Sequence, residues 1–303
     1  MSSQTLLERS TAGGAPHRAA VNVASPGCAA SVASHRCAVV EHRWVNARYK
    51  YLRLAAEAPL ARTTRPGQFY QLRCPTDEVH QPFLLRPMSV YGTGPDEGGI
   101  EFLYNVTGVG TKALAKLPMG GHMDIVGPLG NTFTFDASFE RILVVARGVG
   151  LATMAPLVRQ AGAAGVGVTA LMSARTPGDL MQAEFLRGVP ARVHAVYDSD
   201  GTSSVEAMEV LLRRLLVEEA PQVVYTCGSH RLLMLLQRVL ADYPQIHGEV
   251  AMEQRMACGM GVCLSCVRLF DSGGSGHLKQ FKRVCREGPV FPVREVVGEV
   301  EFG

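Results

Sequence analysis

Four cysteines near the C-terminus constrain this chain more than any other feature of its sequence. Cys258, Cys263 and Cys266 form a C-x4-C-x2-C pattern, and Cys285 follows after a loop. This is the plant-type spacing for a [2Fe–2S] cluster, in which four thiolates hold two irons. Gly259 lies inside the pattern, and without a Cβ it lets backbone N–H groups approach the sulfurs. The pattern therefore predicts a cluster that carries one electron at a time.

Two other interpretations of the cysteines remain open from the spacing alone. A structural zinc site also takes four cysteines, but usually as two close pairs, whereas only Cys263 and Cys266 form such a pair here. The thiols could also stay without a metal. A disulfide framework fits poorly, because it is typical of short secreted chains and this chain has 303 residues.

Composition excludes several classes of function. The formal net charge is only +3, which gives no reason to expect nucleic acid or an anionic membrane as a partner. The sequence contains no run of 18 uninterrupted apolar residues, so we expect no membrane span. Eight cysteines, four of them in one metal-binding pattern, favour a reducing compartment and hence the cytoplasm.

The sequence pattern divides the chain into four segments. Residues 1–36 are rich in Ala, Ser and Gly and are expected to form a disordered tail. Residues 37–138 contain short β-prone runs separated by Pro and Gly, which predicts an antiparallel β-barrel. Residues 139–247 alternate strands with helices, which predicts an α/β domain with a parallel sheet. Residues 248–303 carry the cysteines and are too few to build much core alone.

Hydrophobic periodicity gives the expected elements of the two larger segments. In the barrel we expect strands at 49–54, 68–72, 88–91, 100–104 and 122–126. In the α/β domain we expect strands at 142–146, 166–171, 192–197 and 222–226, and helices at 153–160, 205–219 and 232–241.

The first candidate site is Arg86-Pro87-Met88-Ser89, at the entry to an expected strand. The planar guanidinium of Arg86 suits a phosphate, and the hydroxyl of Ser89 could meet a flavin ring nitrogen. The alternative interpretation is an ordinary strand start with a surface arginine.

The second candidate site is the glycine turn that contains Gly110 and Thr111. The turn opens a short helical stretch, so its backbone N–H groups and the hydroxyl of Thr111 could face a phosphate. A plain capped turn is the alternative.

The third candidate site contains Gly148 and Gly150, between the strand at 142–146 and a helix. An open α/β sheet binds nucleotides at this place. The full G-x-G-x-x-G pattern is missing, because Thr153 occupies the position of the last glycine. Arg147 beside the glycines could meet a phosphate or face solvent.

The fourth candidate site is Cys227-Gly228, at the end of the strand at 222–226. Parallel strands end at one sheet edge, so this site and Gly148 should lie together. A small residue there leaves room for a planar ring. The alternative is a buried free cysteine.

Taken together, the order of barrel, nucleotide domain and cluster module resembles the ferredoxin–NADP reductase superfamily. The run from Glu253 to Cys266 and the segment from Val284 to Phe291 are similar to those of electron-transfer subunits of NAD-dependent dihydroorotate dehydrogenases. The flavin half of the superfamily is matched by Arg86-Pro87-Met88-Ser89, Leu103-Tyr104-Asn105, Gly110-Thr111 and Gly127-Pro128-Leu129-Gly130-Asn131.

The resemblance implies a cofactor set of FAD, a [2Fe–2S] cluster and NAD(H). FAD would lie between the barrel and the nucleotide domain. Arg86 would hold a phosphate, Ser89 would face the isoalloxazine, and Gly110 with Thr111 would cradle the pyrophosphate. The other residues of the implied flavin site are Pro87, Met88, Leu103, Tyr104 and Asn105.

The nucleotide would dock over Gly148, Gly150 and Cys227-Gly228, and the family's partner is a catalytic subunit that contains FMN. Nicotinamide exchanges two electrons as hydride and the cluster exchanges one, so the flavin must lie between them. The implied function is an electron relay between NAD(H) and the partner's flavin. A reductase for an oxygenase or another dehydrogenase, and a non-enzymatic zinc-bearing binding module, are the competing hypotheses.

Overall fold

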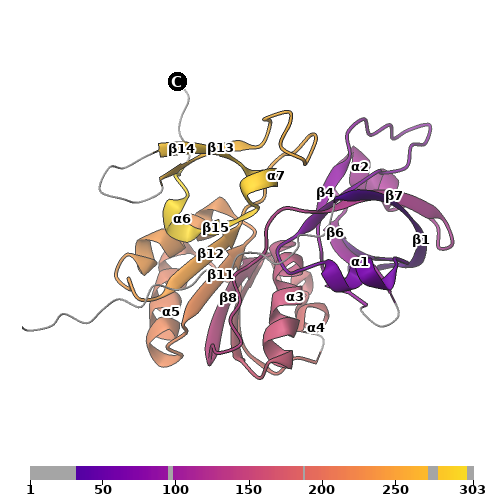
Figure 1. The fold of residues 1–303 in the computed structure, drawn as a ribbon. Coiled ribbons are helices and arrows are strands. Elements are labelled where there is room, and N and C mark those ends of the chain that lie inside the picture. Colours follow the sequence, from indigo (N-terminus) through magenta and orange to yellow (C-terminus); the bar gives the residue numbers. More distant parts are fainter. Residues whose placement is uncertain (1–31, 95–97, 187, 272–278, 299–303) are drawn as a thin grey trace, which may run out of the picture.

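Three parts make up the fold of this computed structural model, which describes residues 32–94, 98–186, 188–271 and 279–298. They are a curled antiparallel sheet, a mixed sheet covered by helices, and a small C-terminal module that lies above both (Figure 1). The predicted fold class, a β-barrel domain, a parallel-sheet α/β domain and a cysteine-bearing module, is confirmed. Most of the expected tail, residues 1–31, lies outside the described part of the chain.

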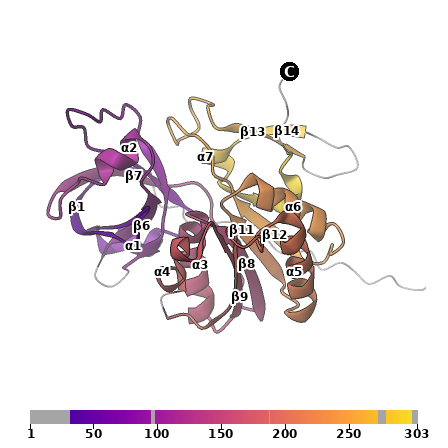
Figure 2. The ribbon, with the colours of Figure 1, turned by 180° about the vertical axis from the view of Figure 1, so that it is seen from behind.

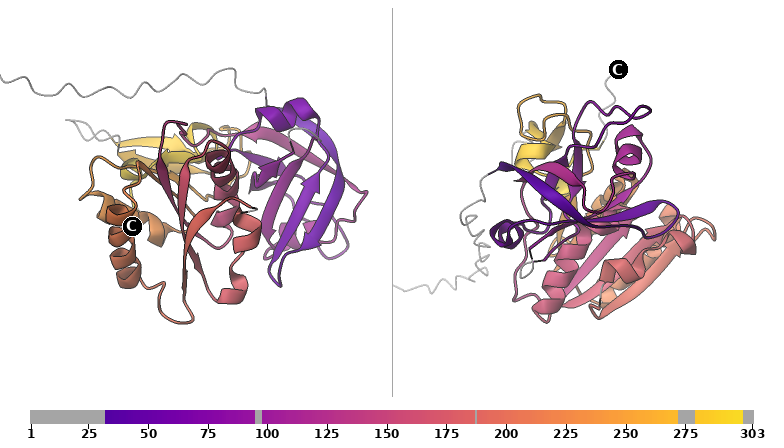
Figure 3. Two further views of the ribbon diagram at one scale, coloured as in Figure 1. Left: turned by 90° about the horizontal axis from the view of Figure 1, so that it is seen from below. Right: turned by 90° about the vertical axis from the view of Figure 1, so that its right-hand side faces the viewer.

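The N-terminal sheet has the strand order β4-β3-β7-β1-β2-β6-β5. It curls around a core that includes Leu52, Phe102 and Ile125, and its curvature is visible end-on in Figure 3. Its elements are β1 (Ala33–Trp44), β2 (Tyr49–Leu54), α1 (Ala58–Thr63), β3 (Phe69–Leu72), β4 (Arg86–Ser89), β5 (Gly92–Thr93), β6 (Ile100–Asn105), α2 (Val109–Leu114) and β7 (His122–Leu129).

Strand β1 was not among the expected strands, and it begins inside the range assigned to the tail. Its first half, Ala33–Ala38, pairs with β7, and the stretch from Val39 to Trp44 pairs with β2. The sequence of β1 mixes small, charged and apolar residues, so no period-2 pattern marks it. Its two neighbours, both distant in sequence, define it as a strand.

The second sheet has the order β10-β9-β8-β11-β12-β15, with only β15 antiparallel. Its elements are β8 (Arg141–Arg147), α3 (Gly150–Ala163), β9 (Gly167–Ala174), η1 (Pro177–Asp179), α4 (Gln182–Leu186), β10 (Ala191–Tyr197), α5 (Val205–Glu218), β11 (Val223–Cys227), α6 (His230–Leu240) and β12 (His247–Ala251).

Strand β8 shows why this sheet is covered on both faces. Val144 and Ala146 pack in the cluster that includes α3 and α4, whereas Leu143 and Val145 pack in the cluster that includes α5 and α6. Figure 2 shows these helix pairs on opposite sides of the sheet. The interior of β8, residues 142–146, is entirely apolar, which is the expected signature of a doubly covered parallel sheet.

The C-terminal module shares the second sheet and its core. It contains β13 (Val267–Asp271), β14 (Lys279–Arg283), α7 (Val284–Glu287), β15 (Val290–Pro292) and η2 (Val293–Glu295). Strand β15 pairs with β12, so the sheet continues past the expected boundary at residue 247 into the module. Phe270 and Phe291 are buried in the same cluster as α5 and α6. None of the helices in the described ranges is long and apolar enough to cross a membrane.

The two-sided burial of β8 predicts a large cost for truncating its core residues. Leu143 has no exposed surface, so Leu143→Ala should lower the free energy of unfolding by about 2–5 kcal/mol. Val217 is 69% exposed on α5, and Val217→Ala should change it by about 0.5 kcal/mol or less. Urea unfolding of both variants measures the difference, and similar values would contradict the doubly covered sheet.

Candidate cofactor and electron-transfer site

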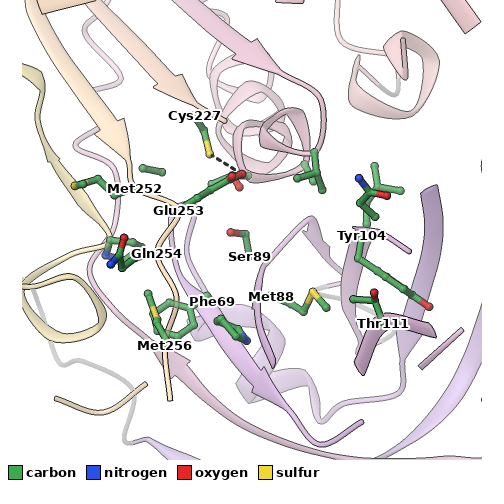
Figure 4. A pocket seen from close by; sticks show the side chains of 18 residues that line it. Phe69, Met88, Ser89, Tyr104, Thr111, Cys227, Met252, Glu253, Gln254 and Met256 are labelled. Atoms are coloured by element: carbon green, nitrogen blue, oxygen red, sulfur yellow. Dashed lines mark hydrogen bonds between the residues drawn. The ribbon is translucent and has the colours of Figure 1, made fainter. Parts of the chain in front are cut away.

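A cavity of about 280 Å³ lies where the barrel, the edge of the second sheet and the C-terminal module meet. Figure 4 shows Ser89 and Met88 on the barrel side and Cys227 at the end of a sheet strand. The residues predicted from the sequence that line this cavity are Pro87, Met88, Ser89, Leu103, Tyr104, Asn105, Thr111 and Cys227. The structure therefore brings together most of the flavin set and part of the nucleotide set.

Asn105 carries a buried polar atom that needs a partner. Among the described residues, no group forms a hydrogen bond with its Oδ1 atom, and its side chain lines both this cavity and a second one of about 200 Å³. Buried polar atoms of this kind are rare in native proteins and usually receive a hydrogen bond from a ligand or water. A flavin or nucleotide donor in the cavity fits this requirement.

Arg86 does not line the large cavity but packs against the turn that begins α2. A Cβ on Gly110 would lie 2.5 Å from Nε of Arg86, so only glycine permits this approach. The guanidinium donates a hydrogen bond to the carbonyl of Leu84, and no carboxylate pairs with it among the described residues. An arginine with no ion-pair partner beside a helix start suits a phosphate.

Thr111 has two roles at this turn. Its Oγ1 atom accepts hydrogen bonds from the backbone N–H groups of Thr107 and Gly108, at 3.0 and 3.1 Å. The side chain also borders the cavity. The hydroxyl of Thr111 therefore caps the turn, as the alternative interpretation expected, and the same side chain also borders the cavity.

The second cavity lies at the ends of β8 and β9 and the start of α3. Gly148 and Gly228 line it, together with Tyr49 and Arg48 of the barrel. This is the crevice at which open α/β sheets bind nucleotides. Gly150 lies elsewhere: a Cβ there would be 2.6 Å from the carbonyl oxygen of Cys227, so this glycine permits close packing of α3 on β11.

The guanidinium of Arg147 is already bound to other side chains of the protein. It forms an ion pair with Asp198 and donates a hydrogen bond of 2.7 Å to Oγ of Ser173. The carboxylate of Asp198 accepts hydrogen bonds from Arg147 and from the hydroxyl of Ser203, and these hold the pKa of Asp198 well below its usual range. The side chain of Arg147 is thus used to tie the ends of three strands together.

Cys227 meets an acidic side chain that the sequence interpretation did not assign to the site. Its Sγ lies 4.0 Å from Oε1 of Glu253 (Figure 4). Glu253 is an exposed residue, but nearby protein removes part of the hydration of its carboxylate, and this desolvation raises its pKa. Burial, together with the charge of Glu253, also raises the pKa of Cys227, so the thiol stays protonated.

Several cavity residues were missed from the sequence. They come from the loop before the cysteines, from the barrel and from the start of α3, and they are Phe69, Val149, Ala152, Thr153, Ala251, Met252, Glu253, Gln254, Met256 and Pro289. Most are apolar and carry no chemical signature. Glu253 had one usable signal, a carboxylate two residues after the end of strand β12.

The four predicted ligand cysteines form two pairs. The thiols of Cys258 and Cys263 contact each other, and so do those of Cys266 and Cys285. No group of three or more potential ligands surrounds a single metal position in the described part of the chain. Two irons with two thiolates each match two pairs, whereas a zinc ion needs four thiolates around one point.

The first pair is prepared for thiolate chemistry by hydrogen bonds. The hydroxyl of Ser265 and nearby backbone groups lower the pKa of Cys263 to about 6. Burial opposes ionisation of Cys258, but N–H groups of Met260, Val262 and Cys263 outweigh it and lower its pKa. Backbone donors aimed at sulfur are what a negatively charged iron–sulfur cluster requires.

Structural comparison places this arrangement among the reductases. A solved NADH-dependent reduced ferredoxin–NADP oxidoreductase shares the fold with a TM-score of 0.70 and 24% identity, over 86% of this chain and 90% of that one. A ferredoxin reductase of carbazole 1,9a-dioxygenase matches with a TM-score of 0.58 and 19% identity, over 73% and 70% of the two chains. Both comparisons show that this chain has the fold of the ferredoxin–NADP reductases.

Sequence comparison gives the family. Residues 253–297 match the iron–sulfur cluster binding domain of dihydroorotate dehydrogenase B. The electron transfer subunit of dihydroorotate dehydrogenase B (NAD(+)) from Desulforamulus reducens is 32% identical over 80% of this chain and 91% of its own length. The corresponding subunit from Shouchella clausii is 30% identical over 77% and 87%. The chain belongs to this family of electron-transfer subunits.

Membership settles two of the sequence predictions. The cofactor set of FAD, a [2Fe–2S] cluster and NAD(H) is confirmed, as is an NAD(P)H-linked oxidoreductase function. The hypotheses of a zinc-bearing binding module and of an oxygenase reductase are not favoured.

The raised pKa of Glu253 predicts a pH-dependent stability. Between the ordinary glutamate pKa and the raised value the folded state binds more protons than the unfolded state, so stability falls as pH rises. Glu253→Gln should therefore match the wild type below about pH 4 and be more stable at neutral pH. Urea unfolding across this range measures the difference, with exposed Glu140→Gln as the control. Equal stabilities of Glu253→Gln and wild type at neutral pH would contradict a raised pKa.

Proposed function

We propose that this chain carries electrons between NAD(H) and a catalytic subunit that contains FMN and acts on dihydroorotate. The observation that carries the proposal is that all three parts of the fold line the same cavity of about 280 Å³. Ser89 of the barrel, Cys227 of the nucleotide sheet and Met256 beside the cluster loop all line it. Cofactors bound to the three parts would therefore lie next to one another.

The residues divide between holding and shielding the cofactors. Arg86 and the turn at Gly110 would hold the phosphates of FAD, and Asn105 would accept a hydrogen bond from a bound ring. Gly148 and Gly228 would leave room for the nucleotide at the sheet edge. When bound, FAD exchanges electron pairs with nicotinamide and single electrons with the cluster.

The exposed side of the cluster loop is a suitable approach for the partner. Cys263 is exposed, and Val262 and Leu264 beside it are 80% and 59% exposed. Apolar side chains around an exposed ligand are typical of a surface that a partner covers. The four ligand thiols must stay reduced until they bind iron, which favours the cytoplasm.

Anaerobically purified protein should show flavin and [2Fe–2S] absorbance, and both should bleach on addition of NADH. Cys263→Ala removes one of four ligands, so it should lose the cluster bands and their iron but keep flavin and NADH-to-dye activity. Cys74 is one of the cysteines outside the set, and the control variant Cys74→Ala should keep both cofactors. A wild-type protein with flavin but no cluster would contradict the relay.

Arg86→Ala should weaken retention of FAD, because it removes the cation beside the α2 turn. The loss of a charge-assisted contact should raise the dissociation constant of FAD at least about tenfold. Fluorescence titration of the apoprotein with FAD measures this, with Arg62→Ala on α1 as the control. Unchanged affinity in Arg86→Ala would remove Arg86 from the phosphate site.

A further inference from the structure

Two side-chain amides of the flavin half, Gln71 and Asn131, contact both cysteine-bearing segments of the C-terminal module. We propose that they are positioning residues that fix the distance between the flavin pocket and the cluster. The proposal rests on the proposed function, because it assumes that both cofactors occupy their sites. Neither the sequence motifs nor the family relationship assigns this positioning role to Gln71 or Asn131.

Gln71 lies beneath the ligand loop. It belongs to β3, directly opposite Pro87 of β4, and is only 1% exposed. Its Nε2 atom donates a hydrogen bond of 3.4 Å to the carbonyl of Ala257, next to the first ligand. A Cβ on Gly259 would lie 2.5 Å from the same atom, so the loop follows the amide closely. The ligand loop thus rests on a strand that also borders the flavin pocket.

Asn131 holds the segment that follows the last cysteine. Its Nδ2 atom donates hydrogen bonds to the carbonyls of Glu287 and Val290, at 3.0 and 2.9 Å. Its Oδ1 atom accepts one from the N–H of Val290 at 2.9 Å, and its own N–H donates to the carbonyl of Gly288 at 2.7 Å. Within the described part of the chain, every hydrogen bond of Asn131 thus goes to residues 287–290.

The contacts to the flavin half contrast with those to the nucleotide domain. Strand β15 continues the second sheet, and Nε2 of Gln237 on α6 donates to the carbonyls of Val293 and Val296. These contacts attach the module to the nucleotide domain but do not connect it directly to the barrel. Gln71 on β3 and Asn131 after β7 make that direct connection, one to each cysteine-bearing segment.

Spacing matters because electron transfer between two fixed centres slows steeply as the distance between them grows. NADH is oxidised to NAD⁺ and a proton, and its two electrons reach the cluster one at a time. Without the two amides, the module would be held to the barrel mainly through the nucleotide domain, which is a longer path and fixes the separation less closely. The two amides provide a direct hold without touching either cofactor's covalent ligands.

The test compares Asn131→Ala with Gln237→Ala in the full chain loaded with both cofactors. Each change deletes one amide that anchors the same module, the first to the flavin half and the second to the nucleotide domain. Stopped-flow absorbance after mixing with NADH separates flavin reduction from cluster reduction. Hydrogen exchange of residues 284–291 reports on the position of the segment independently of activity, and redox titration gives the cluster potential.

We expect Asn131→Ala to slow cluster reduction several-fold while NADH-to-dye activity and the cluster potential stay unchanged. Amide hydrogen exchange in residues 287–290 should become faster, because Asn131 no longer holds this segment. Gln237→Ala should leave the rate of cluster reduction unchanged. Gln71→Leu, which keeps bulk beneath the loop but removes the amide, should also slow cluster reduction.

Three outcomes would overturn the proposal. The first is a wild-type rate in Asn131→Ala although exchange shows the segment released. The second is equal slowing by Gln237→Ala, which would indicate general loosening of the module. The third is loss of NADH-to-dye activity, which would place Asn131 in the flavin site itself. Failure of the proposed function is distinguishable, because the wild type would then not reduce its cluster with NADH.

Discussion

The addition of β15 to the edge of the parallel sheet is the interaction on which the cofactor arrangement depends. It brings the chain after Cys285 alongside β12, and the N–H of Met252 then donates to the carbonyl of Pro289 at 2.9 Å. From this point the chain runs along the cavity into the ligand loop. One strand pairing thereby joins a small module to a larger core, which it could not build alone, and brings both cysteine segments within reach of Gln71 and Asn131.

Desolvation acts on two titratable side chains that line the cavity. It raises the pKa of Cys227, which stays a thiol, and it also raises the pKa of Glu253. The cations lie at the periphery, with Arg86 at the α2 turn and Arg48 at the second cavity. This position of the cations suits cofactors whose phosphates carry negative charge.

Arg147 shows how tertiary contacts decide the role of a side chain that the sequence leaves open. Its place beside Gly148 would suggest a phosphate contact. The structure instead commits the guanidinium to Asp198 and Ser173, at the ends of the neighbouring strands. A bidentate arginine–carboxylate pair is geometrically specific, so this side chain stabilises the sheet edge next to the nucleotide crevice.

The sequence by itself determined the cluster, the fold class and most strands, because cysteine spacing and hydrophobic period are local properties. It also predicted a flavin set, of which Ser89, Asn105 and Thr111 line the cavity. Strand β1 and the extension of the second sheet into the module depend on partners far along the chain, so only the tertiary structure decided them. The same holds for Glu253, Gln71 and Asn131: an amide or a carboxylate acquires its role from the groups that packing places beside it, and those groups are distant in sequence.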